Sequence, residues 1–96
     1  MLTPKQRRYL RSLAHSLKPV VLTGSAGLTD AVLNEIDQAL AHHELIKVKL
    51  TGGDRQAREV MMTTICQRTG GDAVQHIGRV SIIYRPASDA RIKLPA

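Results

Sequence analysis

Two glycines, Gly24 and Gly27, are the residues of this sequence that could most directly bind a ligand. They enclose Ser25 and Ala26 and follow the short apolar run 20–22. Because glycine has no Cβ, the backbone between them can adopt positive φ and approach a ligand closely. A helix expected just beyond Gly27 would direct its unpaired N–H groups and positive dipole end toward the same place, which suits a phosphate oxygen. The stretch predicts an anion-binding turn, and a plain turn is the alternative that the pattern alone leaves open.

Basic residues gather around this turn in the sequence. The chain has a net charge of +6, and no Asp or Glu precedes Asp30. The positive residues before that point are Lys5, Arg7, Arg8, Arg11 and Lys18. Because self-repulsion makes such an asymmetry slightly unfavourable for folding, it indicates attraction to a polyanion. Nucleic acid is the first candidate; an anionic membrane surface or an acidic protein partner is the alternative.

Most of these basic residues lie on a predicted helix over residues 4–17. Thr3 can act as its N-cap, Pro4 suits the first helical position, and Gln6 completes a capping box. Apolar residues recur at three- and four-residue spacing and predict its buried stripe: Leu10, Leu13, Ala14 and Leu17. The outer surface is then left to Lys5, Arg8, Arg11 and His15. Lys18-Pro19 ends the helix, and residues 20–22 form a short strand.

The middle of the chain predicts a second helix and a strand. Thr29 or Asp30 can cap a helix that runs to about residue 43. The residues expected to face inward are Val32, Leu33, Ile36, Ala39 and Leu40. Residues 44–51 alternate as a strand, with an apolar face of Ile46, Val48 and Leu50. Its other face is predicted to be wet and basic, with Lys47 and Lys49 as a second candidate patch.

The last part of the chain predicts a helix and a hairpin. Asp54 can cap a third helix that ends at Gly70, where glycine permits a left-handed C-cap. The residues expected to face the core are Ala57, Val60, Met61, Thr64 and Ile65. Strands 73–77 and 80–85 should pair around Gly78-Arg79. The ordered core is expected over about residues 3–86, followed by a loosely held polar tail, 87–96.

Length and composition predict one domain. Ninety-six residues, 43% of them apolar, suffice for a single core. No apolar run approaches the roughly 18 residues that a membrane span requires. The N-terminus is charged and lacks the apolar centre of a secretion signal. These observations predict a cytoplasmic protein without a membrane segment.

Catalytic and metal chemistry have no matching pattern. Cys66 is the only cysteine, which excludes an internal disulfide and a multi-cysteine metal site. None of the four histidines has a Cys or Asp at ligand spacing. Ser25 directly follows Gly24, so the Gly-x-Ser-x-Gly pattern of hydrolases is absent, and no Gly-Lys-Ser/Thr completes a P-loop. We therefore expect no catalytic residue, no metal, no cofactor and no small-molecule substrate.

Aromatic residues are scarce. Tyr9 and Tyr84 are the only ones, and the chain contains neither Phe nor Trp. Single-strand-binding platforms stack several bases on exposed rings. Contact with the nucleic acid backbone is therefore the better expectation than a platform of stacked bases.

Longer stretches of this sequence resemble the CRM domain, and most closely the stand-alone bacterial YhbY-like proteins. The resemblance covers nearly the whole chain, and the stretches that carry it are 13–21, 24–29, 42–49, Gly78-Arg79 and 84–86. The resemblance implies a single compact α/β domain of order αβαβαββ. It also implies a four-stranded mixed sheet, with helices packed on it, similar to the C-terminal domain of a bacterial translation initiation factor.

The resemblance further implies a non-enzymatic RNA-binding protein associated with precursors of the large ribosomal subunit. We expect a monomer, although the sequence does not reveal whether the protein dimerises. In such domains the glycine turn is the proposed RNA contact, which transfers here to Gly24, Ser25, Ala26 and Gly27. The loop is similar to the Gly-x-x-Gly of KH domains, which clamps a nucleotide backbone. KH loops usually carry cations between their glycines, whereas Ser25 and Ala26 are neutral, so neighbouring residues must supply the charge.

The sequence thus leads to one hypothesis and several rivals. In the hypothesis, the glycine turn and the start of the second helix hold phosphates of structured RNA, and a basic track extends the contact. The track residues are Lys5, Arg8, Arg11 and Lys18, with Lys47 and Lys49 added as a less certain patch. The main rival is a protein-interaction adaptor whose basic helix docks on an acidic partner. A peripheral membrane binder and a small hydrolase are weaker alternatives.

Overall fold

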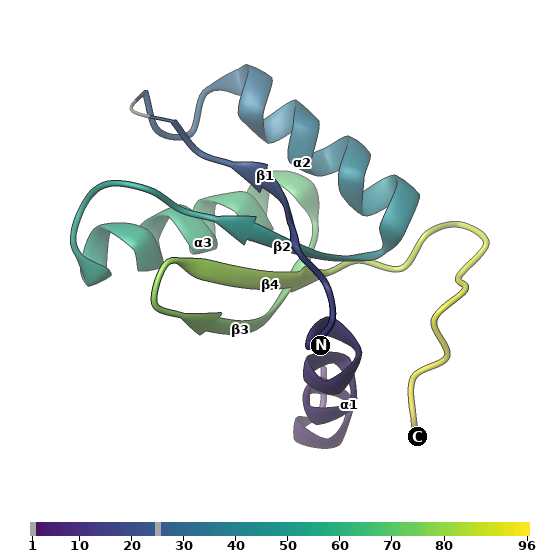
Figure 1. The fold of residues 1–96 in the computed structure, drawn as a ribbon. Helices are drawn as coiled ribbons and strands as arrows, with labels where there is room; N and C mark the ends of the chain where they lie inside the picture. The colour runs from purple at the N-terminus through teal and green to yellow at the C-terminus, as the bar shows by residue number, and fades with distance from the viewer. Residues whose placement is uncertain (1, 25) are drawn as a thin grey trace.

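A computed structural model describes residues 2–24 and 26–96 (Figure 1). The elements in chain order are α1 (Pro4–Ala14), β1 (Pro19–Leu22), α2 (Asp30–His43), β2 (Leu45–Lys49), α3 (Arg55–Thr69), β3 (Asp72–Ile77) and β4 (Val80–Tyr84). The strands form one sheet of order β1-β2-β4-β3. β1 is parallel to β2, and the other two pairs are antiparallel. The predicted αβαβαββ order and mixed four-stranded sheet are confirmed.

The helix ends follow the capping residues read from the sequence. In α1, Thr3 Oγ1 accepts from the Gln6 amide at 3.1 Å and Gln6 Oε1 accepts from the Thr3 amide at 3.0 Å, a complete capping box. Thr29, not Asp30, is the N-cap of α2. In α3, Asp54 accepts from the Ala57 amide at 2.8 Å, and Gly70 closes the helix with φ 74°. These local signals fix where the helices begin and end.

The prediction for the end of α1 is wrong. The helix stops at Ala14 instead of reaching Leu17, and the Leu17 amide donates to the Ala14 carbonyl at 3.0 Å in a tight turn toward β1. Leu13 and Leu17 each remain 37% exposed, whereas Leu10 and Ala14 are fully buried. Because the chain turns here to enter β1, the last residues of the predicted apolar stripe do not reach the core.

Helices cover the two faces of the sheet unequally (Figure 1). α2 and α3 share one face, where they bury the larger core against residues of β1, β2 and β4. Its buried members are Val21, Leu33, Ile36, Leu40, Ile46, Val48, Leu50, Met62, Ile65 and Ile83. The prediction that Val60 faces this core is wrong, because its side chain is 61% exposed and Met62 takes the inward position. We call this the α2/α3 face.

The other face, which we call the α1 face, is only partly covered. α1 packs over one end of it, and the core there comprises Leu2, Leu10, Ala14, Leu45, Val74, Ile82 and Tyr84. The prediction of a uniformly wet face on β2 is therefore wrong in part. Leu45 is 5% exposed, Lys47 is half-buried and Lys49 is exposed. Cover by α1 decreases along the strand toward its C-terminal end.

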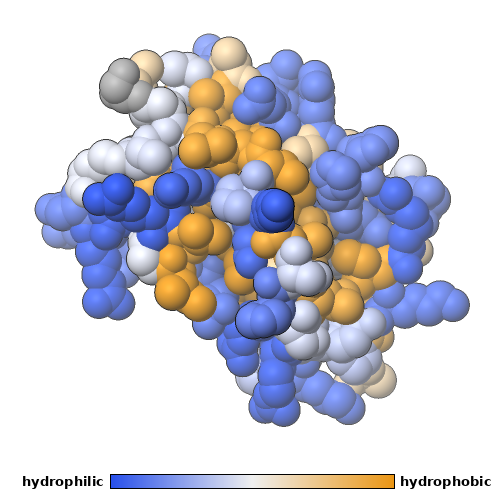
Figure 2. Space-filling view, viewed as in Figure 1, coloured by the Kyte–Doolittle hydropathy of each residue, from blue (hydrophilic) through white to orange (hydrophobic). Residues whose placement is uncertain are grey.

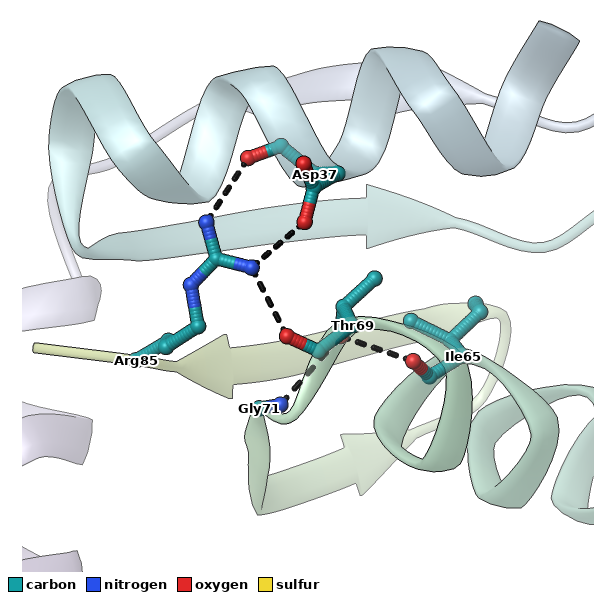
Figure 3. Close-up of polar contacts among 5 residues, drawn as sticks. All are labelled: Asp37, Ile65, Thr69, Gly71 and Arg85. Atoms are coloured by element: carbon teal, nitrogen blue, oxygen red, sulfur yellow. Dashed lines mark hydrogen bonds and ion pairs between the residues drawn. The ribbon is translucent and has the colours of Figure 1, made fainter.

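Arg85, just after β4, ties the α2/α3 face together (Figure 3). Its guanidinium donates to Asp37 Oδ1 at 2.6 Å, to the Asp37 carbonyl at 3.0 Å and to the Thr69 carbonyl at 2.7 Å. Thr69 Oγ1 in turn donates to the Ile65 carbonyl at 2.7 Å and accepts from the Gly71 amide at 3.2 Å. One side chain thus joins α2, the end of α3 and the last strand.

The C-terminal tail is held by Glu44, contrary to the prediction of a loose segment. Glu44 has φ 67° and a carboxylate that is 1% exposed. It accepts from the amides of Ala87, Arg91 and Ile92 at 2.9 to 3.1 Å. Burial raises the pKa of this carboxyl, but the three amides and the charge of Arg91 outweigh burial, so its pKa lies below the ordinary value. The carboxylate anchors the tail at the end of α2.

Candidate nucleic-acid interface

The glycine turn projects from the C-terminal end of β1. The Thr23 amide donates to the Lys49 carbonyl at 3.0 Å, which keeps β1 paired with β2 up to the turn. Thr23 is 1% exposed, and its hydroxyl accepts from the Thr51 amide at 2.9 Å. The Thr51 hydroxyl donates to the Thr23 carbonyl. The base of the turn is therefore fixed by β2 and by the residues that follow it.

Within the turn, the Gly27 amide donates to the Gly24 carbonyl at 3.0 Å. Gly27 has φ 73°, the left-handed region in which glycine has no steric penalty. Gly24 and Ala26 are exposed, whereas Ser25 lies outside the described residues. The Gly27 amide thus closes the turn, and a ligand would meet the exposed edge formed by Gly24 and Ala26.

The start of α2 is a weaker phosphate site than the sequence suggests. Thr29 Oγ1 already accepts from the Val32 amide at 3.1 Å, so the cap uses one of the first-turn donors. Asp30 follows it, and its side chain is 97% exposed, with Arg68 Nη2 at 3.6 Å. A carboxylate in the first turn partly satisfies the helix dipole and repels a second anion. Binding at the turn would therefore depend on cations from other elements.

Arg11 and Lys47 line one hollow on the α1 face. The hollow has a volume of about 260 Å³, and its lining residues are Arg11, His15, Lys47, Gln75, Ile77, Val80 and Ile82. The ammonium of Lys47 also donates to the Leu17 carbonyl at 3.0 Å, which holds this side chain beside the end of α1. The structure thus brings together two basic residues that lie far apart in the sequence.

Lys49 links the hollow to the glycine turn. It pairs with Leu22 of β1 on one side and with Val80 of β4 on the other, and Val80 pairs with Ile77 of β3. These four residues form a row across all four strands, which we call the uncovered strip. Leu22 is 58% exposed and Ile77 is 62% exposed. The strip is a basic and apolar surface at the end of the sheet that α1 covers least.

Lys5 and Arg8 extend from this surface along α1. Lys5, Arg8 and Arg11 follow at three-residue spacing and so form one ridge of the helix. At about 1.5 Å of rise per residue, Lys5 lies roughly 9 Å along the helix axis from Arg11. Both Lys5 and Arg8 are exposed. The ridge, the hollow and the uncovered strip lead toward the glycine turn.

Lys18 lies apart from these residues. It lines a second, apolar groove of about 410 Å³ between α1 and β1, together with Leu13, Leu17, Val20, His43, Leu45, Ile46 and Ile92. Figure 2 shows apolar surface gathered over this side, with hydrophilic side chains around it. Arg11 and Lys18 thus reach the surface on different sides of the end of α1, although they are close in the sequence.

Sequence reasoning missed Arg79 as a candidate. It is exposed in the turn between β3 and β4, and its carbonyl accepts from the Leu50 amide at 2.6 Å, directly after Lys49. The Gly78-Arg79 pair predicted the turn, but nothing in the sequence showed that this turn lies beside β2, the strand that carries Lys49. Arg7 has a different role, because its Nε donates to the Ala73 carbonyl at 3.4 Å and joins α1 to β3.

No nucleophile or metal site was found in the part of the chain that the structure describes. Burial, with a smaller effect of Asp72, raises the pKa of the Cys66 thiol, so little reactive thiolate forms. Burial, then Glu44 and Asp72, raises the pKa of the Tyr84 phenol. Over residues 2–24 and 26–96, His, Cys, Asp and Glu form no group suited to hold a metal ion. Nor does any helix there have the length and apolar character to span a membrane.

The fold and this surface define a small α/β module with a basic, partly uncovered sheet face. The chain belongs to the CRS1 / YhbY (CRM) domain family, whose sequence profile matches residues 2–85. An RNA-binding protein of Haemophilus influenzae is 48% identical over 94 residues, which cover 98% of this chain and 95% of that protein. YqeI of Bacillus subtilis, named a probable RNA-binding protein, is 33% identical over 96 residues, covering 99% of this chain and all of the relative.

A solved structure supports the same assignment. The solution structure of SAV1595 from Staphylococcus aureus, described as a candidate RNA-binding protein, superimposes with a TM-score of 0.86 at 38% sequence identity. It covers 99% of this chain and 100% of the other. The family resemblance predicted from the sequence is confirmed.

Proposed function

We propose that this chain, residues 1–96, is a non-enzymatic domain that binds the backbone of structured RNA. The glycine turn would contact the sugar-phosphate chain, and the cations of the α1 face would neutralise neighbouring phosphates. The observation that carries the proposal is the convergence of Arg11, Lys47 and Lys49 on one partly uncovered surface that leads to the turn. The names of its relatives as RNA-binding proteins support the same ligand.

Within this function, we assign each predicted residue a part. Gly24, Ala26 and Gly27 would form the turn that approaches the backbone, with Ser25 between them. Arg11, Lys47 and Lys49 would hold the phosphates next to it, and Lys5 and Arg8 would extend the contact along α1. Lys18 contributes charge on the other side of α1 and has the weakest support from the structure. The family resemblance supports action on precursors of the large ribosomal subunit, and we expect the protein to act as a monomer in the cytoplasm.

The salt dependence of RNA binding tests the proposal that cations of the α1 face neutralise phosphates. If about five phosphates are neutralised, log K should fall with log salt at a slope of roughly −3.5 to −4.5. A filter-binding titration with a fragment of large-subunit ribosomal RNA measures it. A slope near zero would contradict backbone binding.

Gly24→Glu tests the turn. Gly24 is not among the glycines with positive φ, and a Cβ built on it meets nothing within 4 Å. The variant should therefore fold normally, whereas Gly27→Glu would strain a residue held at φ 73°. We expect Gly24→Glu to weaken RNA binding by about tenfold or more, because a carboxylate would face the phosphates.

Ala41→Glu is the matched control. It adds the same charge at an exposed position near the other end of α2 and should change RNA affinity little. Equal affinities for the two variants would mean that the turn is only structural. The rival function, an adaptor for an acidic protein, predicts that purified material carries no RNA before nuclease treatment, which the ratio of absorbance at 260 and 280 nm would show.

A further inference from the structure

The hollow beside α1 has a floor and a rim of opposite character. The floor is aliphatic, formed by Ile77, Val80 and Ile82 on the neighbouring strands β3 and β4. Ile82 is 6% exposed, whereas Ile77 is 62% exposed, so the floor opens toward the end of the sheet that carries the glycine turn. The rim is polar and is formed by Arg11, His15, Lys47 and Gln75. None of the described residues that line the hollow is acidic.

Neither a phosphate nor an apolar ligand alone accounts for both parts. A phosphate would lose hydration against three aliphatic side chains that offer it no donor. An apolar ligand would leave the cationic rim without a partner. A nucleotide fits both, because its base has an apolar face and its phosphate is an anion.

The rim also contains a group that suits the edge of a base. The Gln75 amide has both donor and acceptor atoms, the combination that pairs with a nucleobase edge. Gln75 lies directly beside Ile82 in the β3–β4 pairing, so its side chain borders the aliphatic floor. Lys47 lies on the other side of Ile82. An amide and a cation thus flank the same apolar surface.

We propose that this hollow binds one unpaired nucleobase of the RNA. The base would lie against Ile77, Val80 and Ile82, its edge would meet Gln75, and its phosphate would lie beside Arg11 and Lys47. This inference rests on the proposed function and deepens it, because it specifies RNA with an unpaired nucleotide next to a helical segment.

The size of the hollow and its lack of aromatic side chains limit it to one base. The volume of about 260 Å³ is below the roughly 300–1,000 Å³ of pockets that hold drug-sized ligands. Tyr84 is 3% exposed within the core under α1, and Tyr9 does not line the hollow. A platform that stacks several bases is therefore absent from the hollow, and the aliphatic floor offers one flat contact.

The test compares five RNA hairpins of equal length and charge. One has a fully paired stem, and four carry a single-nucleotide bulge in the stem, one for each base; all five share the same closing loop, so only the bulge differs. Fluorescence anisotropy with the full chain measures each affinity. We expect the bulged hairpin with the preferred base to bind about tenfold more tightly than the paired one, from one edge hydrogen bond and the burial of one base face.

Two variants locate the effect. Gln75→Ala and Ile77→Ser should each remove most of this preference, measured in the same variant as the ratio of the affinity for the bulged hairpin to the affinity for the paired one. Gln67→Ala and Val60→Ser are the matched controls on α3, since Gln67 is exposed and Val60 is 61% exposed. The controls should keep the preference.

The outcomes separate this inference from the proposed function. Equal affinity for all five hairpins, with a steep salt dependence, would overturn the proposal that the hollow binds an unpaired base and would leave backbone binding intact. A bulge preference that survives both Gln75→Ala and Ile77→Ser would also overturn it. Binding of no hairpin would overturn the proposed function itself and the inference with it.

Discussion

The two faces of the sheet are built from the same strands but are covered very differently. α2 and α3 close one face over the larger core, which includes Ile36 and Leu40 at 0% exposure. α1 closes only one end of the other face, and the uncovered strip at its far end contains Leu22 and Ile77 at 58% and 62% exposure. Apolar residues left in solvent next to Lys49 contribute little to folding. The comparison suggests that one face supplies stability and the other supplies the binding surface.

The largest expected effect comes from the α2/α3 face. Leu40→Ala should lower the free energy of unfolding by about 3 kcal/mol, because it empties a fully buried site in the larger core. Urea denaturation measures the loss. RNA affinity of the folded variant should stay unchanged, and a selective loss of affinity would break the division between the faces.

Arg85→Ala should cost about 2 kcal/mol of stability. Its guanidinium makes three hydrogen bonds to Asp37 and Thr69, and its removal leaves the Thr69 carbonyl without this donor (Figure 3). Arg85→Lys should restore less than half, since one ammonium does not reproduce the forked geometry. Thermal unfolding of both variants tests this, and full rescue by lysine would mean that only the charge matters.

Glu44→Gln should cost about 1–2 kcal/mol near neutral pH, because the three tail amides lose a charged acceptor. The folded pKa of Glu44 is lowered, so its contribution is present above the unfolded pKa of about 4.3 and is lost as pH falls through the folded pKa. Denaturant titrations at several pH values should therefore show the difference between wild type and variant shrinking as pH falls from about 4.3 through the lower folded pKa. A constant difference across that range would contradict the role of the charge.

Lys49→Gln and Arg11→Gln should each weaken RNA binding about three- to fivefold and reduce the salt slope by roughly 0.7 to 0.9, without loss of stability. Arg55→Gln is the control. It removes the same charge from the start of α3, on the opposite face of the sheet, where the Arg55 side chain is 85% exposed (Figure 1). Equal effects of all three substitutions would mean that net charge matters and its position does not.

The smallest effect is expected in the uncovered strip. Leu22→Ser should change the free energy of unfolding by less than about 0.5 kcal/mol, because the side chain is already 58% exposed. Chemical denaturation next to Leu40→Ala gives the direct comparison. A loss similar to that of Leu40→Ala would show that the α1 face is not open in solution.

Local sequence signals predicted most of the fold. Capping residues such as Thr3 and Asp54 and the left-handed Gly70 act over three or four residues, so their effect is visible in the sequence. The mixed four-stranded sheet is not a local feature and was expected only from the family resemblance, and the order of its strands was not predicted. The errors at Leu17 and Val60 arose because periodicity shows which residues share a helix face but not where the neighbouring elements end.

The candidate site was only partly predictable for the same reason. The sequence identified Arg11, Lys47 and Lys49 by charge, but their convergence depends on β2 lying next to β4 under the end of α1. Gln75 carries no charge and belongs to no motif, so nothing in the sequence marked it. Arg79 was seen as a turn residue because its neighbour Leu50 is distant in the sequence.

The anchoring of the tail by Glu44 bears on how this domain should be truncated. The family profile ends at residue 85, which makes a shortened version without residues 87–96 an attractive choice for crystallography or fusion proteins. Such a chain would retain the Glu44 carboxylate at the end of α2 while discarding its three amide donors and the Arg91 guanidinium. Its designers would do well to neutralise that carboxylate as well, or to keep the last ten residues.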